Sequence, residues 1–84
     1  MDDTLVLSLT LEEQYLACVR QGEDLLDKKR YASAAYSFVC ARRVAQKLQE
    51  LPAVPEVKAI WKTLETSAER KRKAANKLRV RRKK

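Results

Sequence analysis

Residues that interrupt an α-helix are almost absent from this chain. Its 84 residues contain one glycine, Gly22, and two prolines, Pro52 and Pro55. Good helix formers such as Ala, Leu, Lys, Arg and Glu dominate the remainder. A proline pushes the residue before it out of the α region, so a helix is expected to end just before Pro52. The sequence therefore predicts an all-α fold.

Apolar residues recur at steps of three and four in three segments, which predicts three amphipathic helices. The helices are expected over about 11–28, about 32–50 and from about 55 onward, where a proline in the first turn costs nothing. Thr10 and Glu13 have the spacing of a capping box and predict the first helix start. The main core positions are expected to be Leu25, Ala34, Phe38, Ile60 and Leu64.

The chain divides into three expected parts. Residues 1–9 alternate weakly between apolar and polar and are expected to be an ordered lead-in that packs on the helices, with an edge strand for a partner as the alternative. Residues 10–68 are expected to form a three-helix antiparallel bundle. Because apolar positions become sparse after Ala68, residues 69–84 are expected to be a basic tail, helical at first and then disordered.

Charge is distributed unevenly along the chain. Its 19 Lys and Arg and 11 Asp and Glu give a formal net charge of +8. Residues 1–27 hold seven acids and one base, whereas residues 69–84 hold ten bases and one acid. The ten bases are Arg70, Lys71, Arg72, Lys73, Lys77, Arg79, Arg81, Arg82, Lys83 and Lys84. Such a tail is expected to bind a polyanion, with a merely solvated end as the alternative.

The ten bases form two clusters, residues 70–73 and 79–84, with Lys77 between them. This spacing resembles a bipartite nuclear-import signal, and it suits phosphate backbones equally well. The tail has no aromatic residue that would stack on bases. Any binding of nucleic acid is therefore expected to be largely independent of sequence.

The first two predicted helices resemble a tetratricopeptide repeat, a helix–turn–helix motif of about 34 residues. The small and aromatic residues Gly22, Tyr31, Ala34, Phe38 and Ala41 stand at the offsets of that family. The resemblance covers roughly residues 15–48, a single repeat, and departs from the family at Cys18, Gln21, Leu25 and Gln46. Since one repeat cannot bury both of its faces, the third helix, which contains Trp61, is expected to cap it.

This resemblance implies a protein-binding face on the first helix, formed by Leu16, Val19, Glu23 and Leu26. Val19 and Glu23 stand where some family members carry residues that clamp a C-terminal carboxylate. A short apolar groove for a partner helix is therefore the better expectation. The alternative is that the third helix or the N-terminal lead-in simply covers these residues.

A weaker resemblance is to the three-helix microtubule-interacting-and-trafficking domain. That family shares the Tyr–Ala–aromatic–Ala run and has a similar size. Asp27 stands one residue nearer to Tyr31 than the corresponding Asp often does in the family, and the run 67–69 partly matches an Arg-Ala-Glu run of its third helix. This resemblance implies a trafficking or microtubule-associated module.

No pattern of catalytic, cofactor-binding or metal-binding residues is present in the sequence. The chain has no His, and its two cysteines, Cys18 and Cys40, lie in apolar helical patterns that are typical of small buried hydrophobes. No secretory signal and no long apolar run are found, so a reducing intracellular location, nucleus or cytoplasm, is expected.

The expected function is that of a non-enzymatic intracellular adaptor, without a cofactor. Its helical hairpin would bind a protein, and its basic tail would bind a polyanion or a nuclear import receptor. Two alternatives remain: an RNA- or DNA-binding component of a ribonucleoprotein, and a trafficking or microtubule-associated module.

Overall fold

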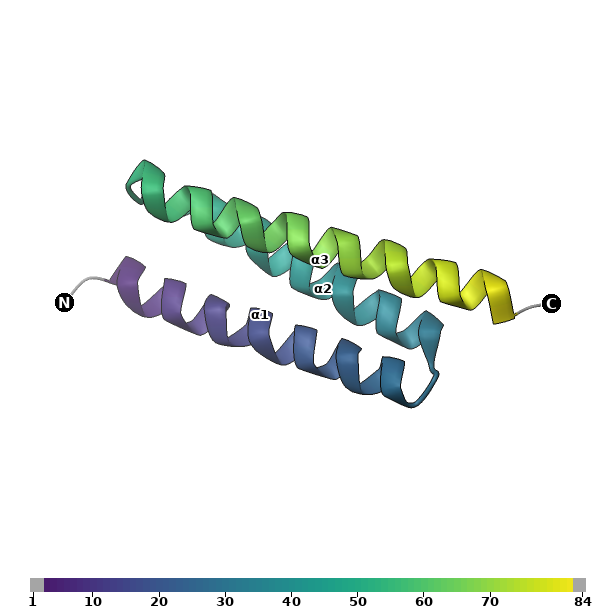
Figure 1. Cartoon of the computed structure of the whole chain (residues 1–84). Coiled ribbons are helices and arrows are strands. Elements are labelled where there is room, and N and C mark those ends of the chain that lie inside the picture. Colours follow the sequence, from purple (N-terminus) through teal and green to yellow (C-terminus); the bar gives the residue numbers. More distant parts are fainter. Residues whose placement is uncertain (1–2, 83–84) are drawn as a thin grey trace.

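The computed structural model describes the backbone of residues 3–82 and the side chains of residues 6–80. The chain forms α1 (Asp3–Asp27), α2 (Tyr31–Gln49) and α3 (Pro55–Arg82), with no strand in the described range. Figure 1 shows that α1 and α3 run in the same direction and that α2 runs antiparallel to both. The predicted all-α three-helix bundle is confirmed.

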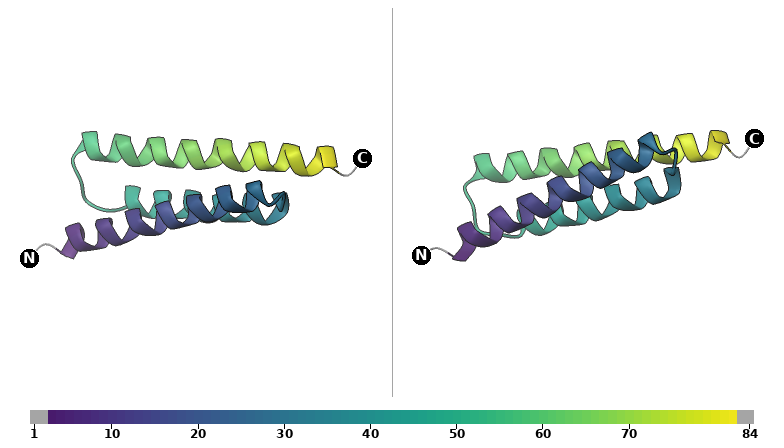
Figure 2. Two further views of the ribbon diagram at one scale, coloured as in Figure 1. Left: turned by 60° about the horizontal axis from the view of Figure 1, so that its bottom comes forward. Right: turned by 90° about the horizontal axis from the view of Figure 1, so that it is seen from below.

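The bundle is elongated, and α2 packs against both of its neighbours. Its principal extents are 53 × 19 × 13 Å, and the long dimension follows α3, whose 28 residues span about 42 Å. The views in Figure 2 place the turn between α1 and α2 at the same end as the C-terminus of α3. The basic half of α3 therefore lies beside the first half of α2.

α1 begins well before the predicted capping box. Thr10 lies inside the helix, where its hydroxyl donates to the Val6 carbonyl oxygen at 3.0 Å. Ser8 and Leu11 are buried, so the helical period of the core face continues toward the N-terminus. The predicted helix start at Thr10 is wrong, and so is the edge-strand alternative for residues 3–9; residues 1–2 lie outside the described part.

The turn between α1 and α2 is made by residues 28–30. Lys29 has a φ of 61°, and the amides of Lys29 and Arg30 donate to the carbonyl oxygens of Leu26 and Leu25 at 2.9 and 2.8 Å. This pair of bonds is the Schellman arrangement that closes many helices. Glycine usually occupies such a left-handed position, but this turn has Lys29 there, so the sequence indicates the end of α1 only weakly.

α1 approaches α2 closely where Gly22 lies against the ring of Phe38. Phe38 is fully buried, and a Cβ placed on Gly22 would lie only 2.5 Å from Phe38 Cε1. A larger residue at position 22 would have to displace the ring or separate the helices. A residue with no side chain is therefore needed at position 22 for α1 to lie this close to the Phe38 ring.

The core of α3 is formed by Trp61, Ala68 and Ala75, which are spaced by seven residues and are at most 4% exposed. Trp61 packs with residues from both other helices, including Leu11 of α1. Ile60 lies on the neighbouring side of the helix and is 58% exposed, so its predicted burial is wrong. Leu25 and Leu64 are half-buried against the core, whereas Ala34 and Phe38 are fully buried as predicted.

α3 continues as one helix through the segment that was predicted to protrude and fray. Ala75 is fully buried and packs in a cluster with Ala34, Ala35 and Phe38 of α2. The expected helical continuation is confirmed, but the expected absence of packing is wrong, because a single methyl group is enough to fill the contact where two small residues of α2 let α3 approach closely. Residues 83–84 of the predicted tail lie outside the described part.

Candidate polyanion-binding surface

The helical form of α3 places several of its cations on one side. Arg70, Lys73 and Lys77 are separated by three and four residues, so they share the outward side of the helix, and all three are exposed. They span about 10 Å along the helix axis. Lys62 and Thr66 continue the same side toward the N-terminus. We call these five residues the basic face of α3.

The other predicted tail bases do not belong to this face. Lys71 and Arg72 are half-buried and lie outside the basic face. Arg79 is exposed, but it follows Arg72 by seven residues and therefore lies on the same side of α3 as Arg72. The backbone of residues 81–82 is part of α3, but their side chains lie outside the described part, as do residues 83–84 altogether. The structure thus brings together only some of the ten bases.

Glu69, the single acid of the predicted tail, is directed toward α2. Its Oε2 accepts from Arg42 Nη1 of α2 at 2.7 Å, and its Oε1 accepts from Arg72 Nε at 2.7 Å and also contacts Arg72 Nη2. The hydrogen bond from Arg72 lowers the pKa of Glu69, and the bond from Arg42 lowers it further against the opposing effect of burial. Arg72 is therefore engaged inside the bundle, which spacing alone does not reveal.

Glu65 makes a second polar connection between α3 and α2. Its carboxylate accepts from Gln49 Nε2 at 2.8 Å and from Gln46 Nε2 at 3.0 Å, and Lys62 Nζ lies 3.3 Å away. The bonds from Gln49 and Gln46 lower the pKa of Glu65 below its ordinary value. Both carboxylates are thus held on the side of α3 that meets α2. Among the described residues, Lys62 is the one cation of the basic face that forms an ion pair.

We expect Glu69→Gln to weaken the bundle at neutral pH by about 1–2 kcal/mol, because the amide has one acceptor oxygen where the carboxylate has two, and it no longer carries the charge that attracts Arg42 and Arg72. A carboxyl group whose pKa is lower in the folded protein than in the unfolded chain stabilises the fold at pH values above the pKa of the unfolded chain. This stabilisation is lost as the pH falls toward and through the pKa of the folded protein. Urea unfolding from pH 7 down to pH 3 should therefore show a smaller loss of stability for the variant than for the wild type. Parallel curves would contradict the role given to Glu69.

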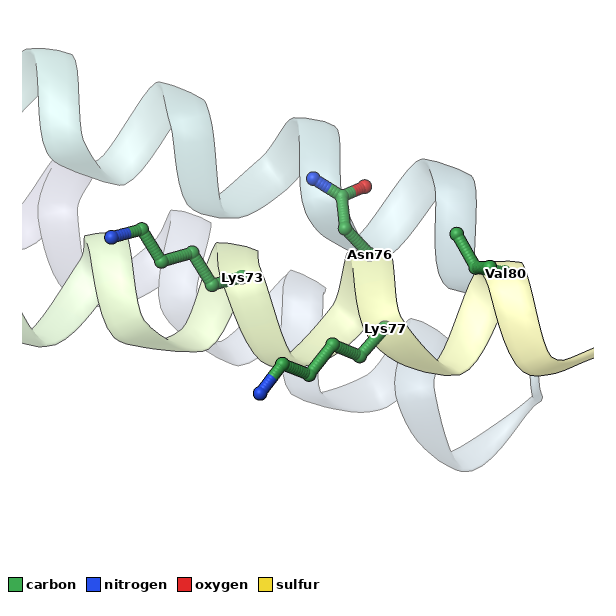
Figure 3. A pocket seen from close by; sticks show the side chains of 4 residues that line it. All are labelled: Lys73, Asn76, Lys77 and Val80. Carbon is green, nitrogen blue, oxygen red and sulfur yellow. The ribbon is translucent and has the colours of Figure 1, made fainter.

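Hollows lie along the exposed side of α3, and two of them meet at Lys73. One is lined by Lys73, Asn76, Lys77 and Val80, and Figure 3 shows Asn76 and Val80 on the side of α3 that is next to α2. The other is lined by Arg42, Lys62, Glu65, Thr66, Glu69, Arg70 and Lys73. Since Lys73 borders both, they form a continuous surface in which cations are accompanied by the amide of Asn76 and, toward α2, by the carboxylates of Glu65 and Glu69.

The predicted protein-binding residues of α1 separate into two pairs. Leu16 is 53% exposed and Glu23 is exposed as well. Val19 and Leu26 are half-buried and pack against the cluster around Phe38. Val6, Leu7 and Leu9 near the start of α1 are also about half exposed. Leu9 precedes Leu16 by seven residues and lies on the same side of the helix, whereas Leu7 precedes it by nine and lies on the opposite side. Sequence reasoning missed these residues because it placed them before the start of the helix.

Cys18 and Cys40 are free thiols, and each is partly exposed. Burial raises the pKa of Cys18, with a smaller rise from Cys40, so the thiol stays protonated and unreactive at neutral pH. The described residues contain no cluster of three or more groups able to hold a metal ion. Within the same residues, no helix is both long and apolar enough to cross a membrane.

Comparison of the chain with protein-family models, with curated proteins and with solved structures finds no match.

Proposed function

We propose that this chain is a non-enzymatic intracellular adaptor that binds a polyanion through α3 and a protein through the exposed side of α1. The observation that carries the proposal is the basic face of α3. Arg70, Lys73 and Lys77 are exposed on one side of an ordered helix and form no ion pair among the described residues. The nearby acids Glu65 and Glu69 are bonded to residues of α2 instead.

Physical chemistry favours a polymer with regularly spaced charges as the ligand. Each phosphate that a Lys or Arg neutralises releases condensed counterions, and this gain grows with the number of contacts. The side-chain amide of Asn76 adds a hydrogen-bond donor of the kind that contacts phosphate oxygens. The described part of α3 lacks an exposed aromatic side chain, so base stacking contributes nothing and sequence preference should be weak.

The test replaces the cations of the basic face while keeping the helix. The triple variant Arg70→Gln, Lys73→Gln, Lys77→Gln should elute from heparin at clearly lower salt and should bind RNA at least about tenfold more weakly. The matched control Arg43→Gln, Lys47→Gln, Lys58→Gln removes the same charge from exposed positions outside this face. Equal losses in both variants would show that net charge, and not the basic face, governs binding.

A ribonucleoprotein component is the second candidate, favoured by the amide donor of Asn76 beside the cations. Capture of partners from a cell lysate, with and without nuclease, separates the two functions. Partners that survive nuclease favour the adaptor, whereas partners that are lost favour assembly on RNA or DNA. An import receptor is a further possible ligand of α3, and a tagged triple variant that leaves the nucleus would support it.

A further inference from the structure

The turn between α1 and α2 brings cations to the end of the bundle where α3 finishes. Lys28, Lys29 and Arg30 follow one another in this turn, and all three are exposed. The views in Figure 2 agree that the turn and the last part of α3 lie at the same end. Cations from two distant parts of the sequence therefore meet there.

A hydrogen bond between α2 and α3 gives the register of these antiparallel helices. Arg42 of α2 donates to Glu69 of α3. Arg30 lies twelve residues before Arg42, and residue 81 lies twelve residues after Glu69. Arg79 is therefore level with Arg30 to within about 3 Å along the bundle, and the axes of packed helices are roughly 8–10 Å apart.

Arg79 lies on the side of α3 that meets the start of α2. It follows Arg72 by seven residues and so shares its side of the helix, where Arg72 is bound by Glu69 next to α2. Arg72 is half-buried there, whereas Arg79 is exposed because α2 begins at Tyr31, which is level with the end of α3. Arg30 and Arg79, which we call the end cations, thus flank the same end of the α2–α3 interface.

The end cations form no ion pair within the part of the chain that the structure describes. Asp24, near this end of α1, is paired with Lys28 at 3.0 Å. Asp27 is the last residue of α1 and follows Gly22 by five residues, so its side chain is turned by about 140° from the side of α1 that meets α2. Two like charges that the fold holds near each other repel, and a bound anion offsets that repulsion.

A hollow connects the end cations with the basic face of α3. It is lined by Lys73, Asn76, Lys77 and Val80, and Figure 3 shows Asn76 and Val80 next to α2 while Lys77 extends away from it. Arg79 follows Lys77 by two residues and hence lies almost opposite to it around α3. A ligand that contacts both residues must pass about halfway around a helix that is only about 10–12 Å wide.

We propose that the polyanion bound by this chain is a single-stranded nucleic acid, which follows the basic face, crosses this hollow and ends on Arg79 and Arg30. A duplex cannot follow this path, because its persistence length is about 50 nm and the path bends within roughly 1 nm. A single strand bends this tightly, and the amide of Asn76 donates to its phosphate oxygens on the way. The inference rests on the polyanion binding of the proposed function and names the class of ligand.

Salt titrations with an oligouridine of about 12 nucleotides, and with its duplex with oligoadenosine, test this path. The double variant Arg30→Gln, Arg79→Gln should bind the single strand several-fold more weakly. Its log–log slope should be shallower by about 1.4, since each phosphate contact of a single strand contributes about 0.7. Its binding of the duplex should match that of the wild type.

The matched control is Arg43→Gln, Lys47→Gln, which removes the same charge from exposed positions of α2 away from this end. It should leave the single-strand slope unchanged. Circular dichroism establishes that each variant is folded. An unchanged single-strand slope in the double variant would remove the end cations from the path and overturn the inference. An equal loss of slope on the duplex would overturn it as well, because the ligand then need not bend.

The triple variant of the basic face, Arg70→Gln, Lys73→Gln, Lys77→Gln, separates this inference from the proposed function. If it loses single-strand binding while the double variant does not, the proposed function stands and the path around α3 is wrong. If the triple variant binds the single strand like the wild type, the proposed function itself fails.

Discussion

Phe38→Ala is expected to lower the free energy of unfolding by about 3–5 kcal/mol, most of the stability that a domain of this size has. The ring is fully buried and contacts α1 at Gly22, while Ala75 of α3 belongs to the same cluster, so its loss opens a cavity between all three helices. Thermal unfolding followed by circular dichroism measures the effect. A variant that melts like the wild type would show that this cluster is not the core.

Tyr36→Ala on the same helix is the matched control, since that side chain is 66% exposed and its removal should cost less than about 0.5 kcal/mol. Gly22→Ala probes the other side of the contact. Its added methyl group should clash with the Phe38 ring and destabilise the bundle by about 1–3 kcal/mol, although alanine favours helix. Phe38→Leu should reduce that penalty, because the shorter side chain leaves room for the methyl group.

Ending the chain after Glu69 is expected to destabilise the bundle as well as to remove charge. The deletion removes Ala75, which covers Ala34, Ala35 and Phe38, and it removes Arg72, which binds Glu69. We expect a loss of about 2–4 kcal/mol and a melting temperature lower by roughly 10–25 °C. A truncated chain that melts like the full chain would show that the second half of α3 contributes nothing to the core.

The triple variant of the basic face is the control for this deletion. Arg70, Lys73 and Lys77 are exposed, so their replacement by glutamine should leave the melting temperature within a few degrees of the wild type. If the deletion lowers the melting temperature and the triple variant does not, a loss of polyanion binding by the shortened chain cannot be assigned to its lost charge alone. Substitution is therefore the appropriate probe of this surface.

The helical hairpin was predictable because its signals are local. The apolar spacing of three and four residues gave the two helices, and Pro52 and Pro55 marked the break between α2 and α3. The start of α1 was missed because Thr10 has a cap-like sequence, while burial of Ser8 and Leu11 favours a longer helix. Tertiary packing overrode a local signal at that position.

The packing of the second half of α3 on α2 was missed for a related reason. Counting apolar residues gave Ala75 little weight, because the pattern does not show that small residues of α2 lie opposite it. The sequence shows that cations are abundant in this segment. It does not show which of them bind acids of the bundle and which are exposed. That Arg72 is bound by Glu69, whereas Lys73 and Lys77 are exposed, depends on which side of α3 meets α2.

The most direct test of the central claim is the salt dependence of RNA binding by the wild type and by the triple variant of the basic face. A plot of log affinity against log salt falls by roughly 0.7–0.9 for each phosphate engaged. If Arg70, Lys73 and Lys77 contact the backbone, the variant should bind more weakly and its slope should be shallower by about 2–3. An unchanged affinity and slope would contradict the claim that this face of α3 binds the polyanion.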